Sequence, residues 1–227
     1  MVFTILSLAL IPVIVLIIFL LAVDRHDREP IRLLSKVFLF GALSSIPILV
    51  IEMILVRFNI FVGLLGILFQ AFIVAGLTEE FIKRMVVMRI AFRHPAFNEK
   101  MDGIIYSAFA ALGFAAVENV MYLFSYFQET PSVAFYRAIF SVPGHMLFAV
   151  TMGYYLALSK YAQSPGMSRK YYSRSLLYPV LLHGTFNTIL SLNLPILLVF
   201  VPFIIFLWVF NMKKLNKFYK ESKQIHS

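Results

Sequence analysis

Long apolar runs separated by short polar segments dominate the chain, and no stretch alternates apolar and polar positions as a half-buried strand does. A helix needs about 20 mostly apolar residues to cross a bilayer. Runs of this kind cover residues 2–23, 37–56, 59–82, 103–127, 136–159, 175–192 and 194–211. The pattern predicts an all-α bundle of about seven transmembrane helices, with a tight turn at Asn193, Leu194 and Pro195 between the last two.

The first run, residues 2–23, is predicted to be a retained helix rather than a secretory signal peptide. No basic region precedes it, no small-residue cleavage site follows it, and a charged segment begins directly after it at Asp24. No soluble linker long enough to separate two domains is present. We therefore expect residues 1–227 to form a single membrane-embedded domain.

Composition supports lipid as the main solvent of the chain. Hydrophobic residues make up 61% of the 227 positions and charged residues only 14%, whereas soluble domains carry about 25% charged residues. The chain has no cysteine, which excludes disulfides, thiolate metal sites and a cysteine nucleophile. The net charge of +9 is explained by basic loops at a membrane surface, so we expect the lipid bilayer and no nucleic acid as a partner.

Basic residues separate the predicted loops into two classes. All of the 20 Lys and Arg residues except Arg57 and Arg137 lie after the first, third and fifth runs or in the C-terminal tail. Because basic loops remain in the cytoplasm, this alternation predicts an exterior N-terminus and a cytoplasmic C-terminus. We expect Arg57 to pair with Glu52 near the outer end of the second run.

Ionisable side chains within the apolar runs need an explanation, because each costs about 2.5–3.5 kcal/mol on insertion scales. Glu79 and Glu80 lie at the end of the third run, four residues before Lys83 and Arg84 respectively, which predicts two ion pairs on a helix. Adjacent carboxylates point about 100° apart on a helix. We therefore expect one of them in a lipid-free cavity and the other against a base.

Three further runs carry polar candidates. Glu118 lies deep in the fourth run, where Gly113 and nearby alanines permit close packing and direct the acid into the bundle. His145 lies near the middle of the fifth run, and His183 and Asn187 share one helix face of the sixth. A structural hydrogen bond explains each residue taken singly. Together they supply the acids, imidazoles and amide that activate water and stabilise an oxyanion.

In this order and spacing the candidates resemble the motifs of PrsW-type membrane proteases. The four motifs are Glu79-Glu80-x-x-Lys83, Phe114-x-x-x-Glu118-Asn119, His145 ahead of Gly153, and His183-Gly184-x-x-Asn187, all within residues 76–187. The family is similar to the wider superfamily of CAAX prenyl endopeptidases and bacteriocin-immunity-type proteases. Glu79, Glu80 and Arg84 also match the first motif of that superfamily, whereas Glu118 stands where its second motif has a histidine.

The resemblance implies a multi-pass endopeptidase of the bacterial cell membrane that makes the first cut in a single-span anti-sigma factor during envelope stress. In the mechanism we infer, Glu79 or Glu80 takes a proton from the hydrolytic water. His183 and Asn187 donate to the developing oxyanion, while Glu118 and His145 position water or protonate the leaving amine. The supporting residues are Lys83, Arg84 and Asn119.

There are three alternatives to a metal-free protease: a zinc protease, a transporter and a non-catalytic scaffold. Zinc could be held by Glu79, Glu118, His145 and His183 with one open position. We place the metal-free scheme first because the zincin signature His-Glu-x-x-His is absent. A proton- or ion-coupled transporter also keeps acids and histidines inside its bundle, although no internal repeat supports one here, and a non-catalytic scaffold needs no buried ionisable cluster.

The division of basic residues provides a direct test of orientation. Reporters fused after Lys36, Lys100 and Lys170 and at the C-terminus are expected to report the cytoplasm, because basic loops are retained there. A reporter fused near Gln128 is expected to report the exterior. An exterior C-terminus would contradict the arrangement of seven spans.

Overall fold

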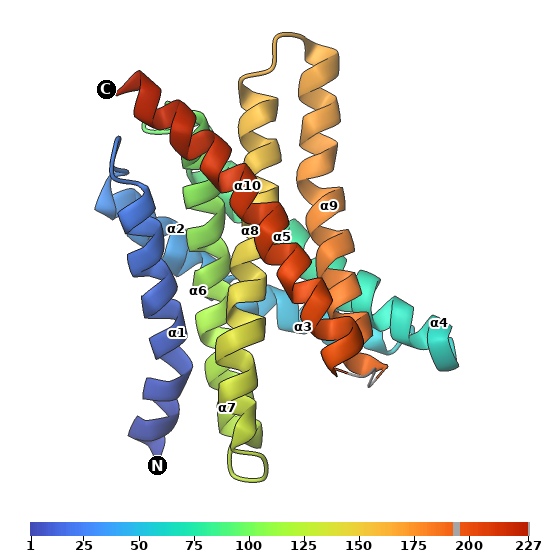
Figure 1. Cartoon of the computed structure of the whole chain (residues 1–227). Coiled ribbons are helices and arrows are strands. Elements are labelled where there is room, and N and C mark those ends of the chain that lie inside the picture. The colour runs from blue at the N-terminus through green and yellow to red at the C-terminus, as the bar shows by residue number, and fades with distance from the viewer. Residues whose placement is uncertain (193–195, 227) are drawn as a thin grey trace.

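The computed structural model describes residues 1–192 and 196–226, and every regular element in these residues is a helix (Figure 1). Six helices are long and apolar enough to cross a membrane: Val2–Val23, Ile31–Val56, Gly63–Ile90, Lys100–Tyr126, Ser132–Lys160 and Leu198–Ile225. This confirms the predicted all-α membrane architecture. A further long helix, α9 (Pro165–Ser191), covers the sixth predicted run. The count of seven spans and the orientation remain predictions, and the predicted turn at 193–195 lies outside the described residues.

Within the six membrane-length helices the winding changes at several points. The elements are α1 (Val2–Val23), α2 (Ile31–Leu43), α3 (Ser45–Val56), α4 (Gly63–Leu68), π-helical η1 (Phe69–Leu77), α5 (Thr78–Ile90), α6 (Lys100–Tyr126), α7 (Ser132–Tyr136), π-helical η2 (Arg137–Ser141), α8 (Val142–Lys160), π-helical η3 (Ile196–Phe200) and α10 (Val201–Ile225). Several helices extend beyond the apolar runs that predicted them, because their polar ends continue the same helix.

Prolines account for two of these changes. Proline has no backbone N–H and its ring clashes with the carbonyl four residues earlier. For Pro47 that carbonyl belongs to Leu43, the last residue of α2. For Pro143 it belongs to Ile139, which lies inside η2, so the helix widens there instead of ending.

The centre of the bundle is formed by α6 and α8, which lie between α1 and α9 (Figure 1). In the apolar part of α6, 78% of the residues are buried, and in that of the α7–α8 segment 61% are buried. In the other membrane-length segments the buried share is only 22–33%. Small residues permit this packing. A methyl group at Gly153 would lie 2.0 Å from the Gly103 carbonyl oxygen, and one at Gly113 would lie 2.0 Å from the Phe38 carbonyl oxygen. The predicted role of Gly113 in close packing is therefore confirmed.

A cluster of carboxyl groups joins the α1–α2 connection to the start of α6. The backbone N–H of Glu29 donates to Asp24 Oδ2 over 3.0 Å, and the Tyr106 hydroxyl donates to the Glu29 carboxylate. Asp102 Oδ2 accepts from the backbone N–H of Glu99 over 2.7 Å at the first turn of α6. Burial raises the pKa of Asp24 to about 7. Burial and the nearby Asp102 carboxylate raise the pKa of Glu29 to about 9.

We expect this cluster to make the folded protein less stable as the pH rises. An unfolded aspartate has a pKa of about 3.9, so between that value and about 7 the folded state keeps a proton on Asp24 that the unfolded state has lost. The free energy of unfolding therefore falls across this range. Asp24→Asn should raise the melting temperature of the detergent-solubilised protein at pH 8 and change it little at pH 4.

Glu129→Gln is the matched control, because Glu129 is an exposed acid. Its melting temperature should follow that of the wild type at both pH values. A lower melting temperature of Asp24→Asn at pH 8 would contradict the assignment.

Candidate active site

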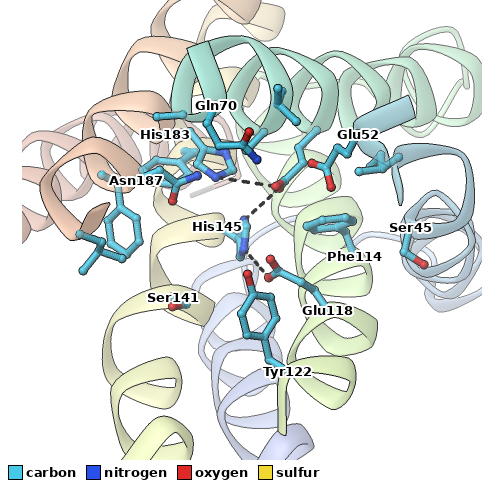
Figure 2. Close-up of a pocket in the computed structure, with 18 of the residues that line it drawn as sticks. Ser45, Glu52, Gln70, Phe114, Glu118, Tyr122, Ser141, His145, His183 and Asn187 are labelled. Atoms are coloured by element: carbon cyan, nitrogen blue, oxygen red, sulfur yellow. Dashed lines mark hydrogen bonds and ion pairs between the residues drawn. The ribbon is translucent and has the colours of Figure 1, made fainter. Parts of the chain in front are cut away.

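A cavity of about 440 Å³ lies between α3, η1, α5, α6, η2, α8 and α9. Its walls carry five of the predicted site residues: Glu79, Glu118, His145, His183 and Asn187. Figure 2 shows His145 between Glu118 and His183, with Asn187 beside His183. The fold therefore brings together residues that the sequence places on four separate apolar runs.

The two neighbouring glutamates are joined by one buried ammonium group. Lys83 Nζ lies 3.0 Å from Glu79 Oε2 and 2.7 Å from Glu80 Oε1, and only 1% of the Lys83 side chain is exposed. Glu79 lines the cavity, whereas Glu80 lies behind it. One acid lies in the cavity as predicted, but both acids, and not one of them alone, lie against a base.

The predicted ion pair between Glu80 and Arg84 is wrong. Glu80 turns into the bundle and contacts Lys83, one residue earlier on the helix. Arg84 instead points to α9, where its Nη1 donates to the Tyr172 carbonyl oxygen over 3.1 Å and lies 3.4 Å from Ser175 Oγ. A tertiary contact has replaced the local i,i+4 pair.

His145 contacts acids through both ring nitrogens. Nε2 lies 2.9 Å from Glu118 Oε2, and the same oxygen accepts a hydrogen bond of 2.6 Å from Arg137 Nη2. A carboxylate paired with a guanidinium only accepts hydrogen bonds, so Nε2 of His145 carries the proton. The lone pair of Nδ1 then faces Lys83 Nζ at 3.3 Å and Glu79 Oε2 at 3.8 Å.

His183 repeats this arrangement from α9. Its Nδ1 lies 3.0 Å from Glu80 Oε1, and its ring stacks on Phe148 with centroids 4.9 Å apart. Because the Glu80 carboxylate is held by Lys83 and only accepts, Nδ1 carries the proton. Nε2 is left with a lone pair 3.9 Å from Glu79 Oε1.

These side chains fit a metal ion. Within the described residues, Glu79, Glu80, His145 and His183 each offer one ligand atom, and the four atoms lie within 4.8 Å of one another. Two imidazole lone pairs face Glu79, and the buried Oε2 of Glu80 has no hydrogen-bond partner in the described part of the chain. Carboxylates together with imidazoles that donate their other N–H to a carboxylate are typical of zinc sites.

The group differs from the zinc ligands predicted from sequence in one member. Glu80 takes part, and Glu118 does not, because Glu118 contacts the far nitrogen of His145. Lys83 Nζ contacts three of the four side chains. A metal ion and the Lys83 ammonium would therefore compete for the same ligand atoms.

The surroundings of Gly184 on α9 and Glu52 on α3 also bear on the site. A glycine beside His183 would allow a substrate backbone to come close, but the Phe72 ring of η1 fills this space, because a methyl group at Gly184 would lie 2.2 Å from it. Glu52 forms no ion pair with Arg57 among the described residues, and its side chain lines the cavity (Figure 2). Residues five apart on a helix point about 140° from each other, so Glu52 faces inward while Arg57 is exposed.

Three further polar residues line the cavity and were not predicted from the sequence. Gln70 and Tyr122 line the cavity from η1 and α6 (Figure 2), and Arg137 lines it from η2. Gln70 is a polar residue within an apolar run. Arg137 is one of the two basic residues outside the basic loops. A polar residue inside an apolar run and a basic residue outside the basic loops are both unusual, so Gln70 and Arg137 could have been recognised as candidates from the sequence.

Comparison with known proteins shows which family the chain belongs to. Residues 29–212 match the PrsW family of intramembrane metalloproteases. The chain is 39% identical to Protease PrsW of Clostridioides difficile (strain 630), covering 96% of this chain and 92% of the relative. It is 34% identical to Protease PrsW of Bacillus subtilis (strain 168), covering 95% of each. No solved structure matches the chain significantly. The chain belongs to the PrsW family of intramembrane proteases.

Proposed function

We propose that this membrane protease hydrolyses a peptide bond of a single-span membrane protein with a water molecule activated by a glutamate. One observation carries the proposal. Glu79 lies in a cavity inside the helix bundle, with His145 Nδ1 and His183 Nε2 3.8 and 3.9 Å from its two carboxylate oxygens. An acid and two imidazoles at this spacing can move protons to and from one water molecule.

Glu79 is the better candidate for the general base. It faces the cavity, where a substrate and water can reach it, whereas Glu80 is 0% exposed and is held by Lys83 and His183. Glu80 then acts as a positioning residue that orients the His183 ring. The two adjacent acids therefore have different roles, with Glu79 as the base and Glu80 as the residue that positions His183.

Asn187 is the donor best placed for the developing oxyanion. Its amide lines the cavity beside His183 (Figure 2). His183 directs its Nδ1 proton to Glu80, so it can donate into the cavity only when both ring nitrogens are protonated. His145 presents its unprotonated Nδ1 to Glu79, so it can take up the proton that Glu79 receives from water and pass it to the leaving amine, while the Glu118 carboxylate stabilises the doubly protonated ring.

A bound metal would be held by Glu79, Glu80, His145 and His183. A metal ion at such a site would supply Lewis-acid polarisation and lower the pKa of a bound water. A metal held in this way would occupy the Glu79 carboxylate and the free ring nitrogens of the two histidines, so the proton transfers assigned above describe the protein without a metal. The description of the family as metalloproteases supports this site.

The substrate remains the expectation drawn from the motifs. A single-span anti-sigma factor, cut first during envelope stress, fits a protease whose acids lie within the bundle. Relationship to the CAAX prenyl endopeptidases likewise rests on the motif residues Glu79, Glu80 and Arg84. The transporter alternative is not favoured by membership of a protease family.

Glu79→Gln should abolish cleavage while the protein remains inserted, because the amide keeps the shape of the side chain but cannot take a proton. Loss of a general base typically lowers the rate by about 10²–10⁴-fold. The measurement is co-expression with candidate single-span membrane proteins, followed by detection of the cleaved product. Glu129→Gln, an exposed acid, is the control. Full turnover by Glu79→Gln would show that Glu79 is not the base.

Lys83→Met should separate the metal-dependent scheme from the metal-free one. Without the competing ammonium, the four ligand side chains should bind zinc more tightly, and zinc should raise the melting temperature of Lys83→Met more than that of the wild type. Without metal, the variant should be destabilised by about 3–5 kcal/mol, because it leaves buried carboxylates without a counter-charge. Calorimetric unfolding with and without zinc, beside metal analysis of the purified protein, measures both effects.

Arg84→Met is the matched control, because in the described part of the chain Arg84 contacts neutral groups, which are the Tyr172 carbonyl oxygen, the Ser175 hydroxyl and the rings of Phe81 and Tyr172. Stoichiometric zinc that disappears in His183→Ala would support the metal site. Wild-type protein that remains free of zinc and fully active with a chelator present would exclude a catalytic metal.

A further inference from the structure

Arg137 is a buried cation that the motifs of the family resemblance do not include. Only 9% of its side chain is exposed, and it lies on η2 in a membrane-length segment. A buried cation is costly unless it is paired and hydrogen-bonded. Its contacts therefore require an explanation.

Arg137 contacts three side chains of α6, and one of them is Glu118, the partner of His145. Its Nη2 donates to Glu118 Oε2 over 2.6 Å and its Nε donates to Asn119 Oδ1 over 2.7 Å. The guanidinium carbon lies 4.0 Å from the centroid of the Tyr122 ring. Asn119 is itself anchored, because its Nδ2 donates to the Ala9 carbonyl oxygen over 2.8 Å. The guanidinium is thus held from two sides and by an aromatic face, as a rigid planar fork permits.

The chain of contacts continues from Arg137 to the cavity. Glu118 Oε2 accepts from both Arg137 Nη2 and His145 Nε2. This fixes the His145 proton on Nε2 and turns the Nδ1 lone pair toward Glu79 and Lys83. Figure 2 shows Glu118 behind His145 as seen from His183. Partners in such positions set the tautomer and the orientation of the ring in front of them.

The same order of groups occurs on the other side of the cavity. There Lys83 holds Glu80, and Glu80 holds Nδ1 of His183. Each imidazole therefore has a carboxylate behind it, and each carboxylate has a cation. The Lys83 chain lies within the motifs, whereas the cation of the second chain is Arg137.

We propose that Arg137 is a positioning residue, which pairs with Glu118 and thereby holds His145 as the Nε2–H tautomer with its Nδ1 lone pair directed at Glu79. Only the effect of Arg137 on catalysis rests on the proposed function. The tautomer itself is a property of the resting protein. The two parts can therefore fail separately.

The direct test is the ¹⁵N spectrum of histidine-labelled protein in detergent after chelator treatment. The chain has five histidines, and the His145 signals are identified by their absence in His145→Gln. In the wild type, Nε2 of His145 should be protonated and Nδ1 should not. Wild-type His145 with the proton on Nδ1 overturns the proposal, and this result requires no Arg137 variant.

Three variants then test the role of Arg137. Arg137→Gln leaves Glu118 without a counter-charge and free to rotate, so His145 should populate both tautomers. Arg137→Lys keeps the charge and should retain the Nε2–H form. Arg57→Gln removes the other arginine outside the basic loops, which is exposed, and should leave the spectrum unchanged. A wild-type tautomer in Arg137→Gln overturns the proposal.

Turnover provides the second readout. Arg137→Gln should lower kcat by about 10–100-fold, the usual effect of losing a partner behind an active-site imidazole, with a smaller change in KM. Arg137→Lys should recover most of this loss, which a purely structural role would not produce. Equal losses in Arg137→Lys and Arg137→Gln overturn the positioning role. If the wild type cleaves no substrate, the proposed function fails, while the spectra still decide the tautomer.

Discussion

The contact between Lys83 and the two adjacent glutamates is the interaction on which the rest of the site depends. At an effective dielectric constant of about 20, two unit charges about 4 Å apart interact with about 4 kcal/mol. Without a cation, this repulsion would drive Glu79 and Glu80 apart or neutralise one of them. Lys83 lies within 3.0 Å of both and is almost fully enclosed. It allows two charged acids to remain in a bundle whose core is apolar.

Around this contact, the site consists of two chains of cation, carboxylate and imidazole that meet at Glu79. One chain runs through Glu80 to His183, and the other through Glu118 to His145. The charges are arranged before a substrate enters, so little reorganisation is needed during the reaction. The packing of α6 against α8 at Gly103 and Gly153 keeps the helix carrying Glu118 next to the helix carrying His145.

The sequence predicted the features that depend on local pattern. Apolar runs predicted the membrane helices, and i,i+4 spacing predicted the pair of Glu79 with Lys83. Features set by partners far along the chain could not be obtained in this way. Glu80 contacts His183 instead of Arg84, and Glu52 faces the cavity because of how α3 is rotated. The number of membrane crossings also depends on α9, whose polar first half is not resolved by hydropathy alone.

The π-helical winding of η1, residues 69–77, ends just before Glu79. A π turn holds about one residue more than an α turn. Winding the same residues as α-helix, with none removed, would rotate everything after them by about 100° around the helix axis for each turn rewound, and would carry Glu79 out of the cavity. The direction of the Glu79 side chain is therefore set by the wide winding of the residues before it as well as by its own position in the chain.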